Sequence, residues 1–243
     1  TNAVIEQTIT VSKNGSIIAV NTDSINPYNI DAETVVLKAL KGYIGTDSNS
    51  VKLARDTLLN ASANGNVNLS SAGRIYTDLI ESYNGAVNLD ADYGIIETEI
   101  HNNLVYNIYA KNGVNLNTKH GNIENIVINT DGIINASAGY NNDVASGMSD
   151  ISIYLLSKQE LSQEDIESLT NDAEKQAVLN EYQKDLKDMK LGTIKASRNI
   201  YIHSEKSILN GANNSSLSGS QVVLSASNGN IGQSDSAIKI DAR

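Results

Sequence analysis

The sequence contains no cysteine, phenylalanine or tryptophan, and only one proline in 243 residues. Without cysteine it has no disulfide framework, no thiol nucleophile and no thiolate metal site. Basic side chains are also scarce: 18 Lys and Arg stand against 28 Asp and Glu, a formal net charge of −10. Binding to nucleic acid or to an anionic membrane depends on Lys/Arg patches. We therefore expect neither of these as the main partner.

No apolar run in the sequence approaches the roughly 18 residues of a membrane-spanning helix, so we predict no membrane span. The chain starts at Thr1, without an initiator Met and without a secretory hydrophobic segment. We therefore expect it to be a fragment or a processed product.

Asparagine is the residue in excess, with 32 copies, whereas charged residues make up only 19% of the chain. The hydrophobic residues are mainly Ile, Val, Leu and Ala. Such a composition is not that of a disordered chain. It favours a protein that buries many short β-branched strands and forms its turns from Asn and Gly.

The tripeptide Gly-x-Ile/Val recurs along the chain. Its ten glycines are Gly15, Gly42, Gly65, Gly73, Gly85, Gly94, Gly121, Gly132, Gly192 and Gly229. We interpret each copy as a turn in which Asn and Gly tolerate positive φ, followed by a buried β-branched residue. The stretches Asn64–Leu69 and Asn84–Leu89 are nearly identical, and Asn112–Leu116 is a shortened copy. In all three, Val-Asn-Leu alternates apolar and polar side chains, as in a strand with one buried face.

A longer repeat links two distant parts of the chain. Val36–Gly45 matches Val223–Gly232 without a gap, and Val51–Leu53 matches Ile238–Ile240 at the same offset. Hairpins could explain the Asn-Gly pairs, so a β-sandwich or an antiparallel barrel is the alternative. A nearly identical sequence one turn later is instead typical of a solenoid, in which like residues stack. The sequence therefore predicts an all-β fold, a right-handed parallel β-helix with coils of roughly 20 residues.

This interpretation predicts which side chains fill the core. The aliphatic residues two positions after the turn glycines should be buried in the stack, among them Ile44, Val67, Val87, Ile96 and Ile231. Both ends of the rod should expose unpaired strand edges.

Residues 157–190 break the repeat pattern, because they contain no glycine and hold 14 of the 46 charged residues. Two capping-box patterns and a helical spacing of apolar residues predict a small inserted α-helical hairpin, with Gly192 as its C-terminal stop. The residues behind this prediction are Ser162–Asp165, Asn171–Glu174, Val178, Tyr182, Leu186 and Met189. Parallel β-helix coils would then occupy residues 1–156 and 191–243, roughly nine or ten coils in a rod on the order of 45 Å long.

The stretch Ser227–Ala242 combines Asn-Gly-x-Ile-Gly, a short polar segment and hydrophobic-Lys-hydrophobic, and Gly42–Leu53 repeats this arrangement. The combination resembles the shaft repeats of filamentous-haemagglutinin-like exoproteins. Within that group, the Asn-rich, cysteine-free composition is most similar to the leukotoxin-type filamentous adhesins of Gram-negative anaerobes. The resemblance implies a very large virulence protein that is secreted or displayed on the bacterial cell surface. It also implies an outer-membrane secretion partner and attachment to a host cell surface or extracellular matrix.

Parallel β-helices also include polysaccharide lyases and glycoside hydrolases, and an enzyme of that kind is the alternative function. Glycoside hydrolysis needs two carboxylates that flank the scissile bond. The candidates are Asp90 with Asp92 and Glu97 with Glu99, whose side chains on a strand would point the same way, about 7 Å apart. No Lys or Arg adjoins either pair in the sequence. A solvated strand face would give the same spacing, so we predict no catalytic residues.

The sequence also lacks motifs for a metal or a cofactor. His101, His120 and His203 form no zinc-binding spacing, and the Gly-Gly repeats of calcium-binding β-rolls are missing. A single calcium ion at an Asp/Asn turn stays an open alternative. The sequence has no phosphate-binding loop and no Gly-x-Ser-x-Gly motif. We therefore predict no cofactor, no cofactor-binding residues and no metal-binding residues.

Tyrosine and asparagine could each carry a binding function. Exposed tyrosines often contribute to interfaces, but without Phe and Trp some should instead fill corners of the stack. Those that cluster in the sequence are Tyr76, Tyr83, Tyr93, Tyr106 and Tyr109. The excess of Asn is explained if Asn side chains at stacked turns bond to their own backbone and to their copies in the next coil. Sequons such as Asn60–Ser62 and Asn135–Ser137 are expected by chance in so Asn-rich a chain.

Taken together, the residues and the resemblance predict a non-catalytic β-helical shaft fragment of a secreted or surface-displayed bacterial protein that acts in attachment. We expect the fragment to be monomeric, with end-to-end contacts as its form of self-association. For the insertion at 157–190, a tolerated surface loop, a contact with a partner and a cover over a groove are the alternatives.

Overall fold

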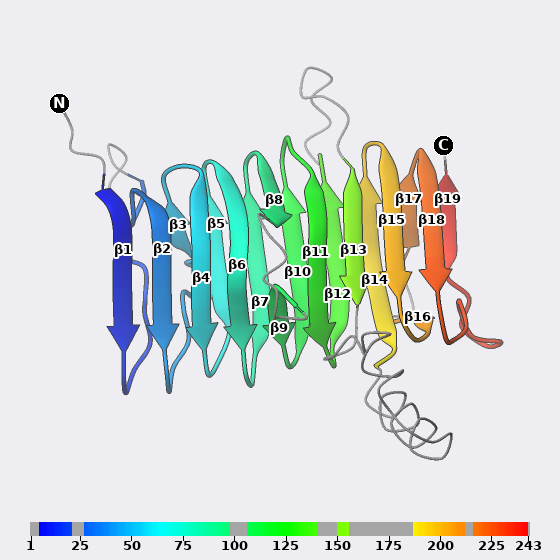
Figure 1. Ribbon diagram of the computed structural model, residues 1–243, viewed down its shortest axis with the longest axis horizontal. Helices are drawn as coiled ribbons and strands as arrows, with labels where there is room; N and C mark the ends of the chain where they lie inside the picture. Colours follow the sequence, from blue (N-terminus) through cyan, green and yellow to red (C-terminus); the bar gives the residue numbers. More distant parts are fainter. Residues whose placement is uncertain are drawn as a thin grey trace, which may run out of the picture.

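The computed structural model is a parallel β-solenoid of about eight turns, which confirms the predicted all-β, parallel β-helix class. Its strands lie side by side along a rod, from β1 (Ile5–Ser12) at one end to β18 (Gln221–Ala226) and β19 (Lys239–Ala242) at the other (Figure 1). The structure describes residues 5–20, 27–97, 106–139, 150–155, 187–211 and 216–242. Within these residues there is no helix, and hence none that could cross a membrane.

The strands form two sheets, between which the chain alternates. The ten-stranded sheet consists of β1, β2 (Ala32–Ala39), β4 (Thr57–Ala63), β6 (Arg74–Ser82), β8 (Gly94–Glu97), β9 (Ile108–Ala110), β11 (Ile123–Thr130), β13 (Ile151–Leu155), β15 (Asn199–Ser204) and β18. The nine-stranded sheet consists of β3 (Val51–Leu53), β5 (Val67–Ser71), β7 (Ala86–Ala91), β10 (Gly113–Thr118), β12 (Ile133–Ala138), β14 (Met189–Ala196), β16 (Ile208–Asn210), β17 (Ser216–Gly219) and β19. Every pairing between these strands is parallel, so each coil stacks directly on the one before it.

Stacked aliphatic columns fill the space between the two sheets. Side chains alternate along each strand, and the inward ones meet their copies in the next coil. Two such columns in the nine-stranded sheet are Val67, Val87 and Val114, and Leu69, Leu89 and Leu116. All six side chains are fully buried. Because each buried aliphatic side chain contributes about 1.5–3 kcal/mol, the columns are the main source of stability.

The coils are longer on average than the sequence predicted, as contacts between stacked asparagines show. Asn68 and Asn88 meet across a separation of 20 in the sequence, whereas Asn88 and Asn115 meet across 27. Asn135 and Thr193 are in contact across a separation of 58, which includes the insertion predicted at 157–190. In the coil from Asn88 to Asn115, both β8 and β9 pair with β6, and the extra residues of the sequence fall between these two strands. The rod therefore has about eight turns rather than the expected nine or ten.

Most of the predicted helical hairpin, residues 157–186, lies outside the described residues. Its predicted end at residue 190 is wrong. Met189 begins β14, pairs with Ile208 and is fully buried, so its side chain fills the solenoid core rather than one face of a helix. Gly192 lies within the same strand and is not a helix stop.

Three of the five core predictions are confirmed: Ile44, Val67 and Val87 are fully buried. Ile96 is not, because Gly94 pairs with Arg74 rather than with Gly73, and this places Ile95 on the inner face. Ile231 was also predicted to be buried, but it is 50% exposed. It belongs to the last coil, over which no further described strand is stacked.

Close contact between coils, rather than positive φ, explains most of the repeated glycines. Of the ten, only Gly94 has a positive φ, so the predicted turn conformation is wrong for the other nine. A Cβ at Gly42 would lie 2.5 Å from the carbonyl of Gly15, and a Cβ at Gly121 would overlap the carbonyl of Tyr93. At most of these positions, successive coils are therefore too close for a larger residue.

The long repeat shared by Val36–Gly45 and Val223–Gly232 is one structural unit used twice. Gly45 and Gly232 both have positive φ, 62° and 80°, and each follows an Ile that bridges to the neighbouring coil. A tight turn comes next, closed by reciprocal backbone hydrogen bonds between Thr46 and Asn49 in one copy and between Gln233 and Ser236 in the other. The chain then enters β3 or β19, respectively.

Candidate functional site

A ladder of asparagine side chains runs along the outer face of the nine-stranded sheet. The amide of Asn88 donates to the side-chain oxygen of Asn68 at 2.6 Å, and that of Asn115 donates to Asn88 at 2.6 Å. Asn135 continues the series by donating to Asn115 at 2.8 Å. The ladder ends on the backbone, at the carbonyl of Gly45 and at the N–H of Thr193. These outward polar groups therefore bond coil to coil within the strands, whereas the excess of Asn led us to expect such bonds at the turns.

Asparagines at the turns and in the sequons bond in the same manner. At the turns, the side chain of Asn84 donates to the side chain of Asn64 at 2.8 Å, and Asn112 donates to the backbone carbonyl of Asn84 at 3.0 Å. Of the two sequon residues, Asn60 lies in β4 and donates to Asp78 at 2.9 Å, while Asn135 is part of the ladder. Both amide nitrogens, at which a glycan would be attached, already bond to neighbouring coils.

Ion pairs connect neighbouring coils along both corners of the solenoid. Where the chain passes from the nine-stranded to the ten-stranded sheet, the pairs are Arg55 with Asp31, Arg74 with Asp56, Lys119 with Asp92 and Arg198 with Asp150. At the other corner they are Lys111 and Lys187 with Asp131, and Lys206 with Asp188. Each pair is partly exposed and is worth only about 0–1 kcal/mol. Their joint effect is to neutralise carboxylates that would otherwise repel one another along the corner.

The carboxylates considered for catalysis lie at one of these corners. Asp90 is on the outer face of β7, and Asp92 follows the strand and pairs with Lys119 of the next coil. No local pattern indicates this partner, because Lys119 is 27 residues away. Burial raises the pKa of the Asp90 carboxyl above its ordinary value of 3.8, an effect that Lys119 opposes and Asp92 adds to. Glu97 ends β8, whereas Glu99 lies outside the described residues.

The two described histidines pack against tyrosine rings. His120 lies 5.8 Å from Tyr93 between ring centroids, and His203 lies 6.4 Å from Tyr154. His101 lies outside the described residues. In the part of the chain that the structure describes, no group of three His, Asp or Glu side chains could hold a metal ion.

Three of the five clustered tyrosines come together around Glu81. The hydroxyl of Tyr83 donates to one carboxylate oxygen of Glu81 at 2.7 Å, and that of Tyr106 donates to the other at 3.4 Å. The Tyr109 ring packs between the two, with centroid distances of 6.2 Å to Tyr83 and 5.8 Å to Tyr106. The hydrogen bond to Glu81 raises the pKa of Tyr83 to about 12. Burial, followed by Glu81, raises the pKa of Tyr106.

The other two tyrosines lie elsewhere. Tyr76 is in β6 near Arg74, and Tyr93 follows β7 at the opposite corner of the solenoid. The sequence reasoning also missed Glu81, whose position two residues before Tyr83 was the one available signal.

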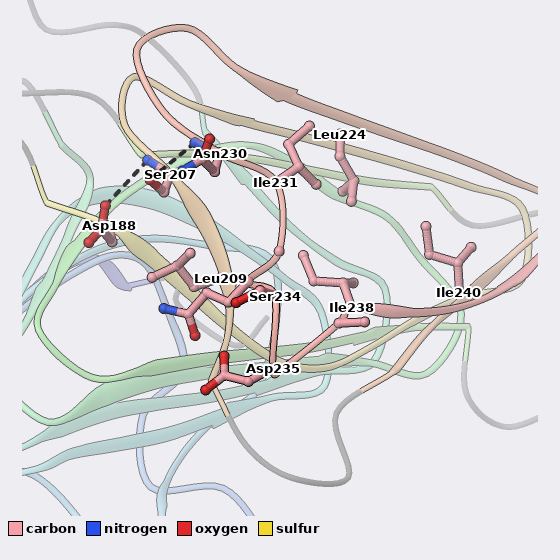
Figure 2. A pocket seen from close by; sticks show the side chains of 13 residues that line it. Asp188, Ser207, Leu209, Leu224, Asn230, Ile231, Ser234, Asp235, Ile238 and Ile240 are labelled. Atoms are coloured by element: carbon pink, nitrogen blue, oxygen red, sulfur yellow. Dashed lines mark hydrogen bonds between the residues drawn. The ribbon is translucent and has the colours of Figure 1, made fainter.

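The last coil encloses an open hollow of about 840 Å³, which Figure 2 shows from close by. Its aliphatic side chains continue the core columns, because Ile240 pairs with the buried Leu217 and Ile231 bridges to the buried Ile208. Polar groups of Asp188, Ser207 and Asn230 lie along one side. The hollow is therefore the end of the core, where β18 and β19 pair on one side only among the described strands, as expected for a rod end.

No family model, curated protein or solved structure matches this chain. The geometry alone therefore defines its class, a parallel β-solenoid with polar ladders between its coils. The resemblance to filamentous-haemagglutinin-like shafts stays a prediction from the repeats.

Proposed function

We propose that this chain is a non-catalytic section of the β-helical shaft of a large secreted bacterial adhesin or leukotoxin-type exoprotein. The parent protein would be exported through an outer-membrane partner and would attach to host cells or extracellular matrix. The observation that carries the proposal is the use of outward polar side chains to bond successive coils, seen most clearly in the ladder from Asn68 to Asn135.

A mechanical role agrees with how these contacts are distributed. In a solenoid, each coil is held chiefly by its two neighbours. The ladder reinforces one outer face, and ion pairs such as Arg74 with Asp56 and Lys187 with Asp131 reinforce the two corners. Both copies of the Ile-Gly turn, at Gly45 and Gly232, adopt the same geometry near opposite ends of the rod. A repeat that can be reused at any level suits a long shaft.

Two experiments test the proposal. The gene that surrounds this sequence should encode more Gly-x-Ile-Gly repeats on both sides and an N-terminal secretion domain. Beads coated with the folded chain should adhere to cultured host cells or matrix proteins more strongly than beads coated with albumin. A gene that encodes neither feature, together with adhesion equal to that of albumin, would contradict the proposal.

The alternative, a polysaccharide lyase or glycoside hydrolase, is favoured by one observation. Asp90 has a raised pKa and lies close to Asp92, which is paired with Lys119, so the two carboxyls differ in environment as an acid and its partner would. Reducing-sugar and unsaturated-product assays over acidic glycans separate the two functions. Turnover that is lost in Asp90→Asn and Asp92→Asn, both folded, would establish the enzyme and overturn the shaft proposal.

A further inference from the structure

Glu81, Tyr83, Tyr106 and Tyr109 form a compact group, here called the tyrosine cluster. Glu81 lies in β6 and is the register partner of Tyr109 in β9, one coil further along. Tyr83 follows β6, and Tyr106 precedes β9. The rings of Tyr83 and Tyr106 are tilted by 44° and 42° against that of Tyr109. Tilted contacts of this kind are favourable between aromatic rings, so the three rings support one another.

The cluster lies at the same corner as Lys111, which interacts with Tyr109 but is paired with Asp131, and the carboxylate of the cluster has different partners from the other corner carboxylates. The corner carboxylates of Asp56 and Asp131 each have a Lys or Arg partner. The hydrogen-bond partners of Glu81 in the described part of the chain are two phenol hydroxyls, those of Tyr83 and Tyr106. Phenols are neutral, so they orient the carboxylate without compensating its charge. The result is a fixed negative charge next to three aromatic rings.

We propose that the tyrosine cluster binds an arginine or lysine side chain of a protein partner. A cation over a tyrosine face is attracted by the electrons of the ring, and a carboxylate next to the ring adds a charge-assisted hydrogen bond. Arginine fits best, because its planar guanidinium both stacks on rings and bonds to carboxylates. Solvent reaches the cluster, since Tyr83 is 48% exposed and Glu81, Tyr106 and Tyr109 are each only partly buried.

Charge favours a cationic partner over a neutral sugar, which could also stack on tyrosine. A sugar that covered the cluster would remove water from Glu81 without supplying a counter-charge, and this costs free energy. The net charge of −10 also attracts cationic partners to the rod and repels acidic glycans. The inference does not depend on the proposed adhesive function, because a solenoid with any other role would carry the same cluster.

The test uses three probes on the folded chain at low and physiological salt. They are a short fluorescent Gly/Arg peptide, the matching Gly/citrulline peptide, and a neutral cello-oligosaccharide as competitor. Citrulline keeps the shape of arginine and removes its charge. Fluorescence anisotropy should show that the arginine peptide binds at least about tenfold more tightly than the citrulline peptide. The oligosaccharide should not displace it.

Substitutions test whether the arginine peptide binds at the tyrosine cluster. Tyr83→Ala and Glu81→Gln should each weaken binding of the arginine peptide about two- to fivefold. Tyr93→Ala is the matched control for loss of an exposed ring, since Tyr93 is 53% exposed and packs on His120 at the other corner. Asp241→Asn is the control for loss of one negative charge, since Asp241 is an exposed residue of β19. Both controls should change binding by less than about twofold.

Several results would overturn the proposal. Equal effects of Glu81→Gln and Asp241→Asn would mean diffuse charge attraction, and equal affinity for both peptides would mean that no cation is recognised. Displacement by the oligosaccharide would make the cluster a sugar site. If circular dichroism shows that Tyr83→Ala is unfolded, Tyr83→Phe replaces it. That variant keeps the ring and frees Glu81 from one hydroxyl, so it should bind at least as tightly as the parent, and weaker binding would contradict the proposal.

Discussion

The side-chain amide of Asn88 donates to the side-chain oxygen of Asn68, one coil away, at 2.6 Å. The same contact recurs from Asn115 to Asn88 and from Asn135 to Asn115. A ladder of this kind requires an amide at the same register position in every coil. The repeated Val-Asn-Leu text therefore reflects the outer face of the solenoid as much as its core.

Asn115→Ala should break the ladder in its middle. Asn115 both donates to Asn88 and accepts from Asn135, so the variant loses two hydrogen bonds. We expect the free energy of unfolding in urea to fall by about 1–2 kcal/mol. Asn117→Ala is the matched control, since Asn117 is the next outward residue of the same strand and should cost less than about 0.5 kcal/mol. Equal losses in the two variants would mean that the ladder adds nothing to stability.

The repeats were sufficient to predict the fold, because a solenoid makes sequence similarity and spatial contact coincide. Val67 and Val87 occupy the same place in two near-identical stretches, and they stack as expected. The same reasoning failed wherever spacing or phase varied. Gly94 occurs one register position later than Gly73, so the inward residue of β8 is Ile95 and not Ile96. The sequence alone does not show such a shift, because residues 95 and 96 are both isoleucine.

Ile95 and Ile96 provide a direct test of which residues of β8 face the core. Ile95 is fully buried and Ile96 is partly exposed on the opposite face of the same strand. Ile95→Ala should lower the free energy of unfolding by about 2–5 kcal/mol, because it removes core contacts and leaves a cavity. Ile96→Ala should cost about 1 kcal/mol or less. Denaturant titration of both variants measures the difference, and the reverse order would show that the strand has the opposite phase.

Gly121→Ala tests whether close approach between coils is the reason for the repeated glycines. The added methyl group would overlap the backbone carbonyl of Tyr93, and backbone cannot move aside without shifting a strand. We expect a loss of about 2 kcal/mol or more. Gly15→Ala is the control, because the nearest atom to its added methyl group is the Ser12 hydroxyl at 3.5 Å, and it should cost about 0.5 kcal/mol or less. A tolerated Gly121→Ala would mean that the corners are less tightly packed.

The candidate sites were harder to predict than the fold, because they depend on contacts between outward side chains. Five tyrosines lie close together in the sequence, which suggested a single group. In the structure the course of the chain around the solenoid places them at two corners and on a strand face. Lys119 meets Asp92 through a coil of 27 residues, longer than the repeat on which the prediction relied. Neither the grouping of the tyrosines nor the Lys119–Asp92 pair follows from local spacing. Both follow once the register of the coils is known.

The hydroxyl of Tyr83 should titrate late. Its hydrogen bond to Glu81 raises the pKa to about 12 from an ordinary 10.0. This contribution to stability is therefore fully present below pH 10.0 and is lost as the pH rises through about 12. Ultraviolet absorbance of tyrosinate should show a Tyr83 phase near pH 12, which Glu81→Gln moves to lower pH. Burial and Glu81 also raise the pKa of Tyr106, so the Tyr83 phase is identified as the difference between titrations with and without Tyr83→Phe. A Tyr83 phase that stays in place in Glu81→Gln would contradict the assigned cause.

Asp90→Asn should stabilise the protein at neutral pH. Burial raises the pKa of Asp90 above 3.8, so what this carboxyl adds to stability is fully present below about pH 3.8 and is lost as the pH rises through the raised pKa. Asparagine stays neutral throughout and can bond to Asn117, the register partner of residue 90 in β10, which adds about 1 kcal/mol or less. Urea unfolding should show this gain at neutral pH and a smaller gain below pH 3.8.

Asp241→Asn, an exposed control, should show no gain at either pH. If Asp90→Asn instead loses stability at neutral pH, attraction to Lys119 outweighs burial, and the direction of the pKa shift is wrong.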